Sequence, residues 1–363
     1  MVDHGIQTLV ITALPNVLYT TNFNGSSAIV VLTMDRLLFI TDFRYIETVE
    51  TNQASDAACP ALELLVVDGS YDATLARVLA GLSGEPGQAI GFEAAHMNVS
   101  RYRWLATTLG DAASAVTLRE TEGIVERARS IKDAYELEAL REGGRRLADV
   151  TRAAFGEVRV GRTEREVALA IDWHIRRGGF ERIAFETIVA SGPNGALPHA
   201  RPTERKLIES DLVVLDFGGV YDSYCVDLAR TVAVGAASHR AREVHDAVRR
   251  AHDRAIASVG VGQSRFAVDE AARSTLDSAG MAAAFGHGTG HGLGLEVHED
   301  PRIVRRRPDS DLRDEHLAPG MVFTVEPGAY FPGWGGVRIE DDVALTDQGA
   351  ELLTDVTTEL LEL

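Results

Sequence analysis

The sequence predicts an α+β protein built from two domains. Its 363 residues are enough for a sizeable core and for a second domain. Short apolar runs of strand character alternate with longer runs of helical periodicity. A charged segment, Glu122 to Asp133, separates a first part of mixed pattern from a larger second part. We therefore expect a smaller mixed α/β domain over residues 1–125, a linker at 126–133 and a second domain over 134–363.

The first domain is expected to contain several strands and one clear helix. A turn at Met34 to Arg36 joins two strand-like runs, and a helix is expected over Asp72 to Leu82. Four apolar runs bounded by turn residues predict strands, namely Ala28 to Leu32, Leu37 to Thr41, Leu62 to Val67 and Ala89 to Phe92.

The second domain is expected to combine long helices with an antiparallel-leaning sheet. Thr163 and Glu166 form a plausible capping box before a helix that carries Val167, Ile171 and Ile175 on one face. Further helices are predicted over Ala134 to Phe155, Arg240 to Val259 and Ala267 to Ser278. Strands are predicted over Thr187 to Ala190, Leu212 to Phe217, Val226 to Val234, Val322 to Glu326 and Val337 to Leu345. The charged segment Arg302 to His316 predicts a solvated loop or a loop at the mouth of a site.

Composition excludes several classes of partner. The chain has 45% hydrophobic and 25% charged residues, which is ordinary for a globular protein, and its formal net charge is −18. Nucleic acid and anionic membrane surfaces both require basic protein, so neither is expected as a partner. No uninterrupted apolar run reaches the roughly 18 residues of a membrane span. Cys59 and Cys225 alone make no disulfide framework, and the N-terminus lacks a secretory pattern, so a reducing cytoplasm is the expected location.

Two aspartates end or interrupt strand-like runs in the second domain. Asp216 follows Leu212 to Leu215, and Asp227 comes eleven residues later. A carboxylate in an apolar run is costly to bury without compensation. A hairpin through a turn at Gly219 to Ser223 would bring the two aspartates face to face. The simpler alternative is two capped or salt-bridged aspartates at strand ends.

A glycine-rich segment places three histidines within twelve residues. His287, His291 and His298 lie in HGTGHGLGLEVH, where glycines at alternate positions let the backbone pass close to other groups. The spacing fits neither a phosphate-binding loop nor a dinucleotide-binding turn. Three unobstructed imidazoles favour a functional site over a purely structural one.

Two glutamates complete a set of metal ligands. Glu326 ends one apolar strand, and Glu340 is expected within another. A buried glutamate without a partner would protonate or destabilise the fold. Four acids and one imidazole form a coherent cage that is rich in oxygen, which suits Mn²⁺ first and then Co²⁺ or Zn²⁺. Two cations with bridging carboxylates are a common way to activate water for hydrolysis.

These motifs resemble the metallopeptidase family that holds aminopeptidase P, prolidase and methionine aminopeptidase. They occur in order as a D-x(10)-D pair, HGTGHGLGLEVHE, TVEPG and VRIEDD. The resemblance implies a pita-bread catalytic domain preceded by a creatinase-like N-terminal domain. VRIEDD, together with LPNVLY and TDFRY near the N-terminus, is similar to the proline-specific branch. That branch implies hydrolysis of the Xaa-Pro bond at the N-terminus of dipeptides or short peptides, and a homodimer is expected.

The resemblance also implies how two divalent metal ions are held. Asp216 would bind one metal, and His291 with Glu326 would bind the other. Asp227 and Glu340 would bridge both, and a bridging water or hydroxide would be the nucleophile.

The remaining implied roles concern proton transfer and substrate binding. Glu326 would also act as the general base. His298 would hydrogen-bond the substrate and stabilise the tetrahedral intermediate, and His199 matches the second substrate histidine. His287 and Arg338 match positions that line the proline pocket.

The chain departs from the branch at three positions without losing a ligand. Asn22 stands where glycine is frequent after the early threonine, and Ser223 stands where glycine is frequent before the tyrosine of the second aspartate motif. Ala229 replaces a frequent threonine, which could remove a hydrogen bond behind the metal ligands. Two other functions remain open, a catalytically silent binding module and a non-peptide amide hydrolase on the same fold.

Overall fold

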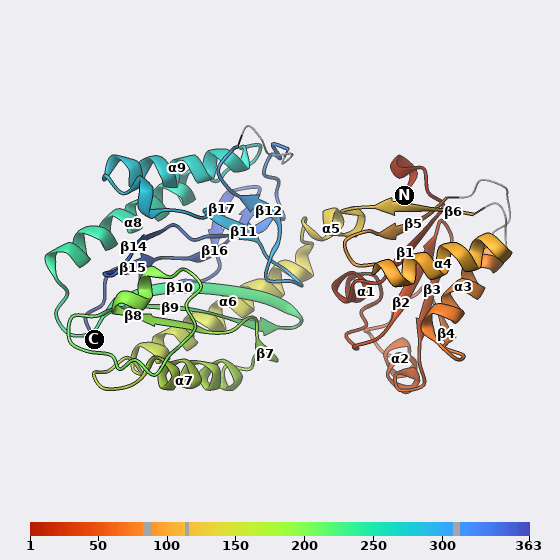
Figure 1. Cartoon of the computed structure of the whole chain (residues 1–363), viewed down its shortest axis with the longest axis horizontal. Coiled ribbons are helices and arrows are strands. Elements are labelled where there is room, and N and C mark those ends of the chain that lie inside the picture. Colours follow the sequence, from red (N-terminus) through yellow and green to blue (C-terminus); the bar gives the residue numbers. More distant parts are fainter. Residues whose placement is uncertain (83–88, 113–115, 308–312) are drawn as a thin grey trace. The chain divides into compact units, whose positions relative to one another are not determined.

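The computed structural model describes residues 1–82, 89–112, 116–307 and 313–363. The chain forms two compact units, Met1–Ala128 and Arg129–Leu363 (Figure 1). Residues 308–312 of the charged segment Arg302 to His316, predicted as a solvated loop or a loop at the mouth of a site, lie outside the described residues. Among the described residues, no helix combines the length and the apolar character needed to cross a bilayer.

The first unit is a six-stranded mixed sheet covered by helices. Its strand order is β4-β3-β2-β1-β5-β6, in which β1 and β2, and β2 and β3, pair antiparallel while the other neighbours are parallel. The strands are β1 (Thr8–Ile11), β2 (Ile29–Thr33), β3 (Leu37–Thr41), β4 (Leu62–Val66), β5 (Ala89–Glu93) and β6 (Thr117–Thr121). The helices are α1 (Leu14–Thr21), α2 (Ile46–Gln53), α3 (Tyr71–Leu82), α4 (Val99–Ala112) and α5 (Ile124–Arg129).

Alternation along the strands gives this sheet two apolar faces. Val10 and Leu38 pack with α3 and α4 on one face, whereas Leu9 and Phe39 pack with α1 and α2 on the other. Successive side chains of a strand point to opposite faces, so a sheet with helices on both sides needs apolar residues at nearly every position. The four predicted strands and the predicted helix of this domain are confirmed to within one residue at every boundary.

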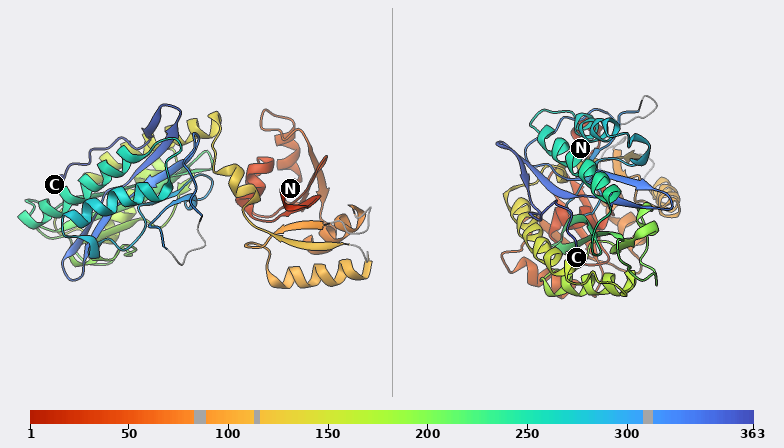
Figure 2. Two further views of the ribbon diagram at one scale, coloured as in Figure 1. Left: turned by 90° about the horizontal axis from the view of Figure 1, so that it is seen from above. Right: turned by 90° about the vertical axis from the view of Figure 1, so that its left-hand side faces the viewer.

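The second unit places strands between two pairs of helices, as Figures 1 and 2 show. The helices are α6 (Ala134–Phe155), α7 (Glu164–Arg177), α8 (His239–Ser258) and α9 (Arg265–Ser278). The strands are β7 (Arg182–Ile183), β8 (Ile188–Ser191), β9 (Leu212–Tyr221), β10 (Tyr224–Ala233), β11 (Gly290–Gly292), β12 (Glu299–Ile303), β13 (Val322–Val325), β14 (Gly328–Phe331), β15 (Gly335–Arg338), β16 (Asp341–Thr346) and β17 (Gly349–Leu352).

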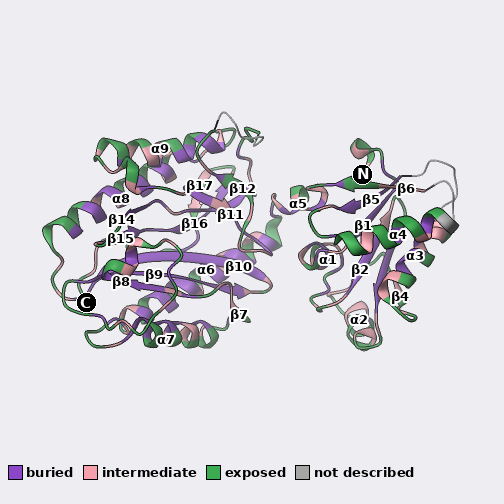
Figure 3. Cartoon of the chain, viewed as in Figure 1, coloured by how far each residue is buried: buried purple, intermediate pink, exposed green. Residues whose placement is uncertain are grey.

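All pairings between these strands are antiparallel, which confirms the antiparallel-leaning sheet expected from the sequence. In one sheet β9 pairs with β10, β7 and β8, and α6 and α7 pack against it. A second sheet has the order β12-β11-β13-β16-β17, and β14 pairs with β15. Helices α8 and α9 pack against this second group of strands. Figure 3 shows that β9 and β10 are buried along almost their whole length.

The sequence signals for α7 are confirmed in full. The side chains of Thr163 and Glu166 exchange hydrogen bonds with each other's backbone N–H groups, which is the predicted capping box. Val167, Ile171 and Ile175 are fully buried. This cap fixes where α7 begins, and with it the position of Glu164 in the first turn.

Two expectations about the strands need correction. The single strand predicted over Val337 to Leu345 is two strands, β15 and β16, which belong to different sheets. The strand is interrupted at Glu340 because the backbone of this residue pairs with Ala229 in β10. The β9–β10 hairpin forms, but its turn is at Asp222 and Ser223 and not at Gly219 to Ser223, because Gly219 still pairs with Val226.

Candidate metal centre

The β9–β10 hairpin carries Asp216 and Asp227 on one face. Asp216 is the cross-strand partner of Ala229, and Asp227 is the partner of Gly218. The aspartates are therefore diagonal neighbours, two residues apart along the ladder, and not directly opposite each other as predicted. Because side chains alternate along a strand, both carboxylates still point to the same side of the sheet.

Glu326 and Glu340 reach the same place from strand ends. Glu326 directly follows β13, and its N–H donates to the carbonyl of Thr289 at 2.6 Å. Glu340 lies between β15 and β16, and its N–H donates to the carbonyl of Ala229 at 3.0 Å. Since Ala229 is opposite Asp216, this bridge places Glu340 beside the aspartate hairpin.

His291 lies in β11, which runs between β12 and β13. The backbone of β11 comes very close to the backbones of both neighbours. A Cβ atom on Gly290 would lie 1.9 Å from the carbonyl oxygen of Thr324, and one on Gly292 would lie 2.2 Å from that of Asp300. Glycine is required on both sides of the histidine for this reason. The His291 Nδ1 is 3.1 Å from the carbonyl oxygen of Gly292, so Nδ1–H donates there and Nε2 is left as a lone-pair donor.

The five residues converge on one cavity of about 310 Å³. Ligand atoms of Asp227, His291 and Glu340 lie within 4.8 Å of one another. The Oδ1 atom of Asp227 is buried and has no hydrogen-bond partner among the described residues. A buried carboxylate oxygen without a partner is costly, and a bound cation would satisfy it. The donor set of carboxylates and one imidazole therefore fits divalent metal ions.

The acids of the centre are hard to ionise without a cation. Burial raises the pKa values of Asp216, Asp227 and Glu340, and the neighbouring acids raise those of Asp227 and Glu340 further. Burial also raises the pKa of Glu326 to about 7, although Arg338 opposes that shift. Burial lowers the pKa of His291 to about 4, so its imidazole is neutral and able to bind a metal.

Arg338 is a buried cation that lines the same cavity as the acids, and each of its three guanidinium nitrogens donates a hydrogen bond. It is 3% exposed. Its Nη1 donates to Oδ2 of Asp216, its Nε donates to the hydroxyl of Tyr330 at 2.8 Å, and its Nη2 donates to the carbonyl of Pro198 at 2.8 Å. Arg338 thus joins β15 to β9 and to the loop that carries His199.

The predicted substrate histidines lie at different distances from the acids. His199 and His298 line the same cavity as the metal ligands, and the His298 ring centroid is 4.3 Å from that of His291. His287 lines a neighbouring cavity with Phe285. Its Nε2 is 3.0 Å from the Tyr330 hydroxyl, so it reaches Arg338 through Tyr330.

Two supporting residues were not identified as such from the sequence. Tyr330 lies between His287 and Arg338, and Asp342 accepts a hydrogen bond from the N–H of Asp227 at 2.9 Å. Asp342 is fully buried. It is the last residue of VRIEDD, so an acid beside a proposed ligand was the signal that could have identified it.

Comparison with known proteins identifies the family of both parts of the chain. Residues 138–347 match the model of metallopeptidase family M24, and residues 1–131 match the creatinase/prolidase N-terminal domain. An uncharacterized peptidase of Bacillus subtilis is 35% identical over 357 residues, which cover 98% of this chain and 96% of that protein. A Pyrococcus furiosus Xaa-Pro dipeptidase is 37% identical over 243 residues, 67% of this chain and 68% of that protein.

Solved structures give the same result over nearly the whole chain. A Bacillus anthracis Xaa-Pro dipeptidase has a TM-score of 0.90 at 35% identity, covering 99% of this chain and 96% of that one. An X-Pro aminopeptidase from Thermotoga maritima has a TM-score of 0.86 at 33% identity, covering 99% and 98%. The chain belongs to metallopeptidase family M24, with the pita-bread catalytic domain following a creatinase/prolidase N-terminal domain.

Proposed function

We propose that this protein hydrolyses the bond between an N-terminal residue and proline in dipeptides or short peptides. The observation that carries the proposal is the convergence of Asp216, Asp227, His291, Glu326 and Glu340 on one cavity. Its volume of about 310 Å³ suits a small ligand. The relatives that bear the names Xaa-Pro dipeptidase and X-Pro aminopeptidase support the choice of substrate.

The five ligands would hold two divalent cations, with Mn²⁺ preferred because four of the five donors are carboxylates. When bound, such cations activate a water molecule and polarise the scissile carbonyl. Asp216 would hold one cation and His291 with Glu326 the other, while Asp227 and Glu340 would contact both.

The protein's own side chains would handle protons and orientation. Glu326 lines the cavity beside the other ligands and would act as the general base. His298 and His199 line the cavity and would hydrogen-bond the substrate, with His298 also stabilising the tetrahedral intermediate. Arg338 and, behind Tyr330, His287 would shape the proline side of the pocket.

This chemistry suits proline because the Xaa-Pro bond is a tertiary amide without an N–H. A peptidase that aligns its substrate through backbone hydrogen bonds would find no N–H donor on the substrate at that position. Activation by metal ions needs no such donor, and nearby acids can hold the free amine of the N-terminal residue. Cleavage would therefore be confined to the N-terminus.

Two further parts of the proposal concern the state of the protein. Cys59 and Cys225 are free thiols, which fits a reducing cytoplasm. We also expect a homodimer. Size-exclusion chromatography with light scattering would test this directly by measuring the molar mass in solution.

The decisive assay uses Mn²⁺-loaded protein with Ala-Pro and with Ala-Pro-Ala, and measures released alanine before and after chelation. Ala-Ala and Ala-Ala-Ala serve as matched controls without proline. Chelator-sensitive cleavage of Ala-Pro alone would indicate a dipeptidase, and preference for the longer peptide would indicate an aminopeptidase. Metal binding without cleavage of either proline peptide would overturn the substrate assignment in favour of a silent binding module or another amide hydrolase.

A further inference from the structure

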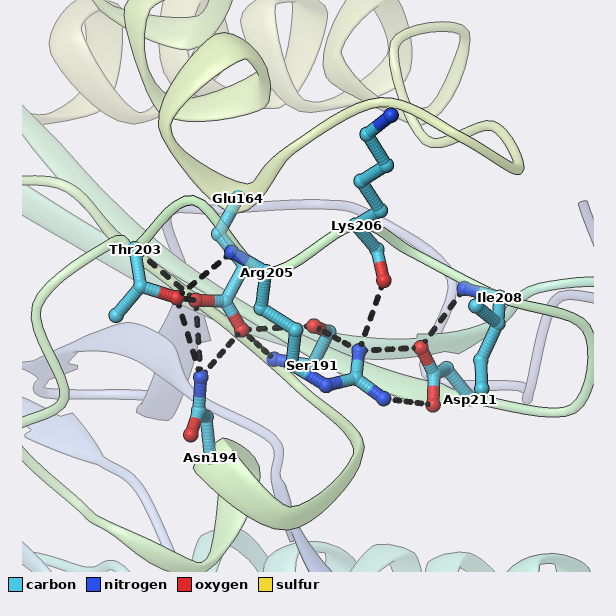
Figure 4. Close-up of polar contacts among 8 residues, drawn as sticks. All are labelled: Glu164, Ser191, Asn194, Thr203, Arg205, Lys206, Ile208 and Asp211. Carbon is cyan, nitrogen blue, oxygen red and sulfur yellow. Dashed lines mark hydrogen bonds and ion pairs between the residues drawn. The ribbon is translucent and has the colours of Figure 1, made fainter.

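A buried polar cluster lies behind the loop that brings His199 to the cavity. The loop runs from Ser191 at the end of β8 to Thr203. Figure 4 shows Glu164 of α7 between these two loop ends, with Asn194 beside it and Arg205 next to Ser191. The cluster is separate from the proposed metal ligands, and none of these residues lines the cavity that the ligands share.

The carboxylate of Glu164 fastens both ends of the loop. Its Oε1 accepts from the N–H of Ser191 at 2.7 Å, from the Ser191 hydroxyl at 2.7 Å and from Asn194 at 3.0 Å. Its Oε2 accepts from the N–H of Thr203 at 3.0 Å and from the Thr203 hydroxyl at 2.6 Å. One carboxylate therefore ties together two backbone positions twelve residues apart in the sequence.

This carboxylate is held in its ionised form. Glu164 is 0% exposed. Burial alone would raise its pKa, but the hydrogen bonds from Thr203, Ser191 and Asn194 bring the pKa below its usual value. Glu164 is also the first residue of α7, where the N–H groups of the helix end favour a negative charge.

Arg205 supports the cluster from the side of Ser191. Its Nη1 donates to the Ser191 hydroxyl at 2.6 Å and to Asp211 at 2.6 Å, and its Nη2 donates to Asp211 at 2.8 Å. The Ser191 hydroxyl thus accepts from Arg205 while it donates to Glu164. The orientation of this hydroxyl is fixed from both sides.

The opposite side of the loop rests on the strand that carries Arg338. A Cβ atom on Gly336 would lie 2.1 Å from the carbonyl oxygen of Gly195, so loop and β15 touch along their backbones. Pro198, directly before His199, accepts from Arg338 at 2.8 Å. His199 therefore lies in a loop whose two ends are hydrogen-bonded to Glu164 and whose middle contacts β15 and Arg338.

We infer that Glu164 is a positioning residue, which holds His199 at the substrate cavity by fastening both ends of the Ser191–Thr203 loop. The inference rests on the proposed function for the part played by His199. The fastening itself is a property of the loop and is measurable without substrate.

The test compares Glu164→Gln with Glu166→Gln. A glutamine keeps the shape of Glu164 but accepts through one oxygen only, so its NH₂ group faces the backbone N–H of either Ser191 or Thr203. Glu166 is a glutamate of the same helical turn whose role in the capping box glutamine also fulfils. We expect kcat/KM on Ala-Pro or Ala-Pro-Ala to fall on the order of 10- to 100-fold for Glu164→Gln, the scale of a small misplacement of a binding group. Metal content should stay unchanged, and Glu166→Gln should match the wild type.

A double-variant cycle with His199→Ala tests whether Glu164 acts through the histidine. If it does, Glu164→Gln should change kcat/KM less than about twofold in the His199→Ala background. An equal loss in both backgrounds would show that Glu164 does not act through His199. Should Glu164→Gln fail to fold, Thr203→Val carries the same comparison. It removes the hydroxyl that donates to Glu164 at 2.6 Å and that also accepts from the N–H of Arg205 at 3.1 Å and from Asn194 at 3.4 Å.

Hydrogen exchange of peptides within residues 191–203 gives a readout that does not depend on activity. Faster exchange in Glu164→Gln, but not in Glu166→Gln, would support the fastening of the loop. If the wild type cleaves no Xaa-Pro substrate, the proposed function fails while this readout still tests the loop. Wild-type exchange in Glu164→Gln, or wild-type kcat/KM, would overturn the inference.

Discussion

Arg338 and Asp216 form a buried ion pair in which Nη1 of the arginine donates to Oδ2 of the aspartate. The arginine side chain is 4% exposed and the aspartate side chain 7%. A buried pair of this kind compensates part of the charge that accumulates where four acids meet. It also makes the arrangement of the metal centre dependent on β15.

The first prediction concerns the stability contributed by Arg338. In the metal-free protein Arg338 offsets the acids, whereas bound cations would do so in the loaded protein. We expect Arg338→Gln to destabilise the metal-free protein by about 3–5 kcal/mol, the cost of breaking a buried pair, and to destabilise the Mn²⁺-loaded protein less. Thermal unfolding with and without chelator measures both losses.

Arg141→Gln is the matched control for this measurement. Arg141 pairs with Glu351 at 2.8 Å, and both side chains are 37% exposed. A pair at the surface contributes about 0–1 kcal/mol, so the loss should be small and independent of metal. Equal losses for Arg338→Gln in both metal states would contradict the compensating role of the arginine.

The second prediction concerns pH. Glu326 has a pKa of about 7 in the folded protein, against 4.5 for an unperturbed glutamate. Between these values the folded state binds more protons than the unfolded state, so stability falls as pH rises. The metal-free protein should therefore lose stability between about pH 4.5 and 7, by at most about 3 kcal/mol from this group. Asp216, Asp227 and Glu340 act in the same direction because burial raises their pKa values too.

Thermal unfolding of the metal-free protein across this range provides the check. Glu326→Gln removes the titrating group and should flatten the dependence. Loading with Mn²⁺ should flatten it as well, since bound carboxylates stay ionised. An unchanged slope in Glu326→Gln would assign the pH dependence to other groups.

How far the sequence predicts this structure depends on whether a feature is decided locally. The capping box of Thr163 and Glu166 and the buried face of Val167 and Ile171 are local, and both are confirmed. The division of Val337 to Leu345 into two strands is not local. Its residues read as one continuous strand, and the break comes from the bridge between Glu340 and Ala229 in another sheet.

The same distinction applies to the site. Asp227 and His291 are noticeable in the sequence because acids in apolar runs and histidines among glycines are unusual. Glu164 is not, because a glutamate in the first turn of a helix is common for electrostatic reasons alone. Only the three-dimensional path of the Ser191–Thr203 loop shows what this carboxylate binds.

The third prediction concerns Ser223 in the β9–β10 turn. Asp222 and Ser223 form the β9–β10 turn with φ angles of 48° and 68°. Both are left-handed, as in the two-residue turns that prefer glycine at the second position. Because a Cβ atom costs roughly 1–2 kcal/mol in this region, Ser223→Gly should raise the unfolding temperature. Ser223→Ala, which keeps the Cβ, should not. A lower unfolding temperature for Ser223→Gly would show that the serine is tolerated for another reason.

The last prediction tests the two-metal assignment through Asp227→Asn and Glu340→Gln. Each change replaces an acid proposed to contact both cations with a neutral amide of the same shape. If each variant loses several kcal/mol of the stabilisation that the cations give to the transition state, kcat should fall by about 10³-fold or more. Metal analysis should also show fewer than two ions per chain. Asp222→Asn is the control in the same hairpin, since asparagine tolerates the left-handed turn and still accepts from Tyr135. Activity retained in either Asp227→Asn or Glu340→Gln would mean that the reaction does not depend on cations shared by these two acids.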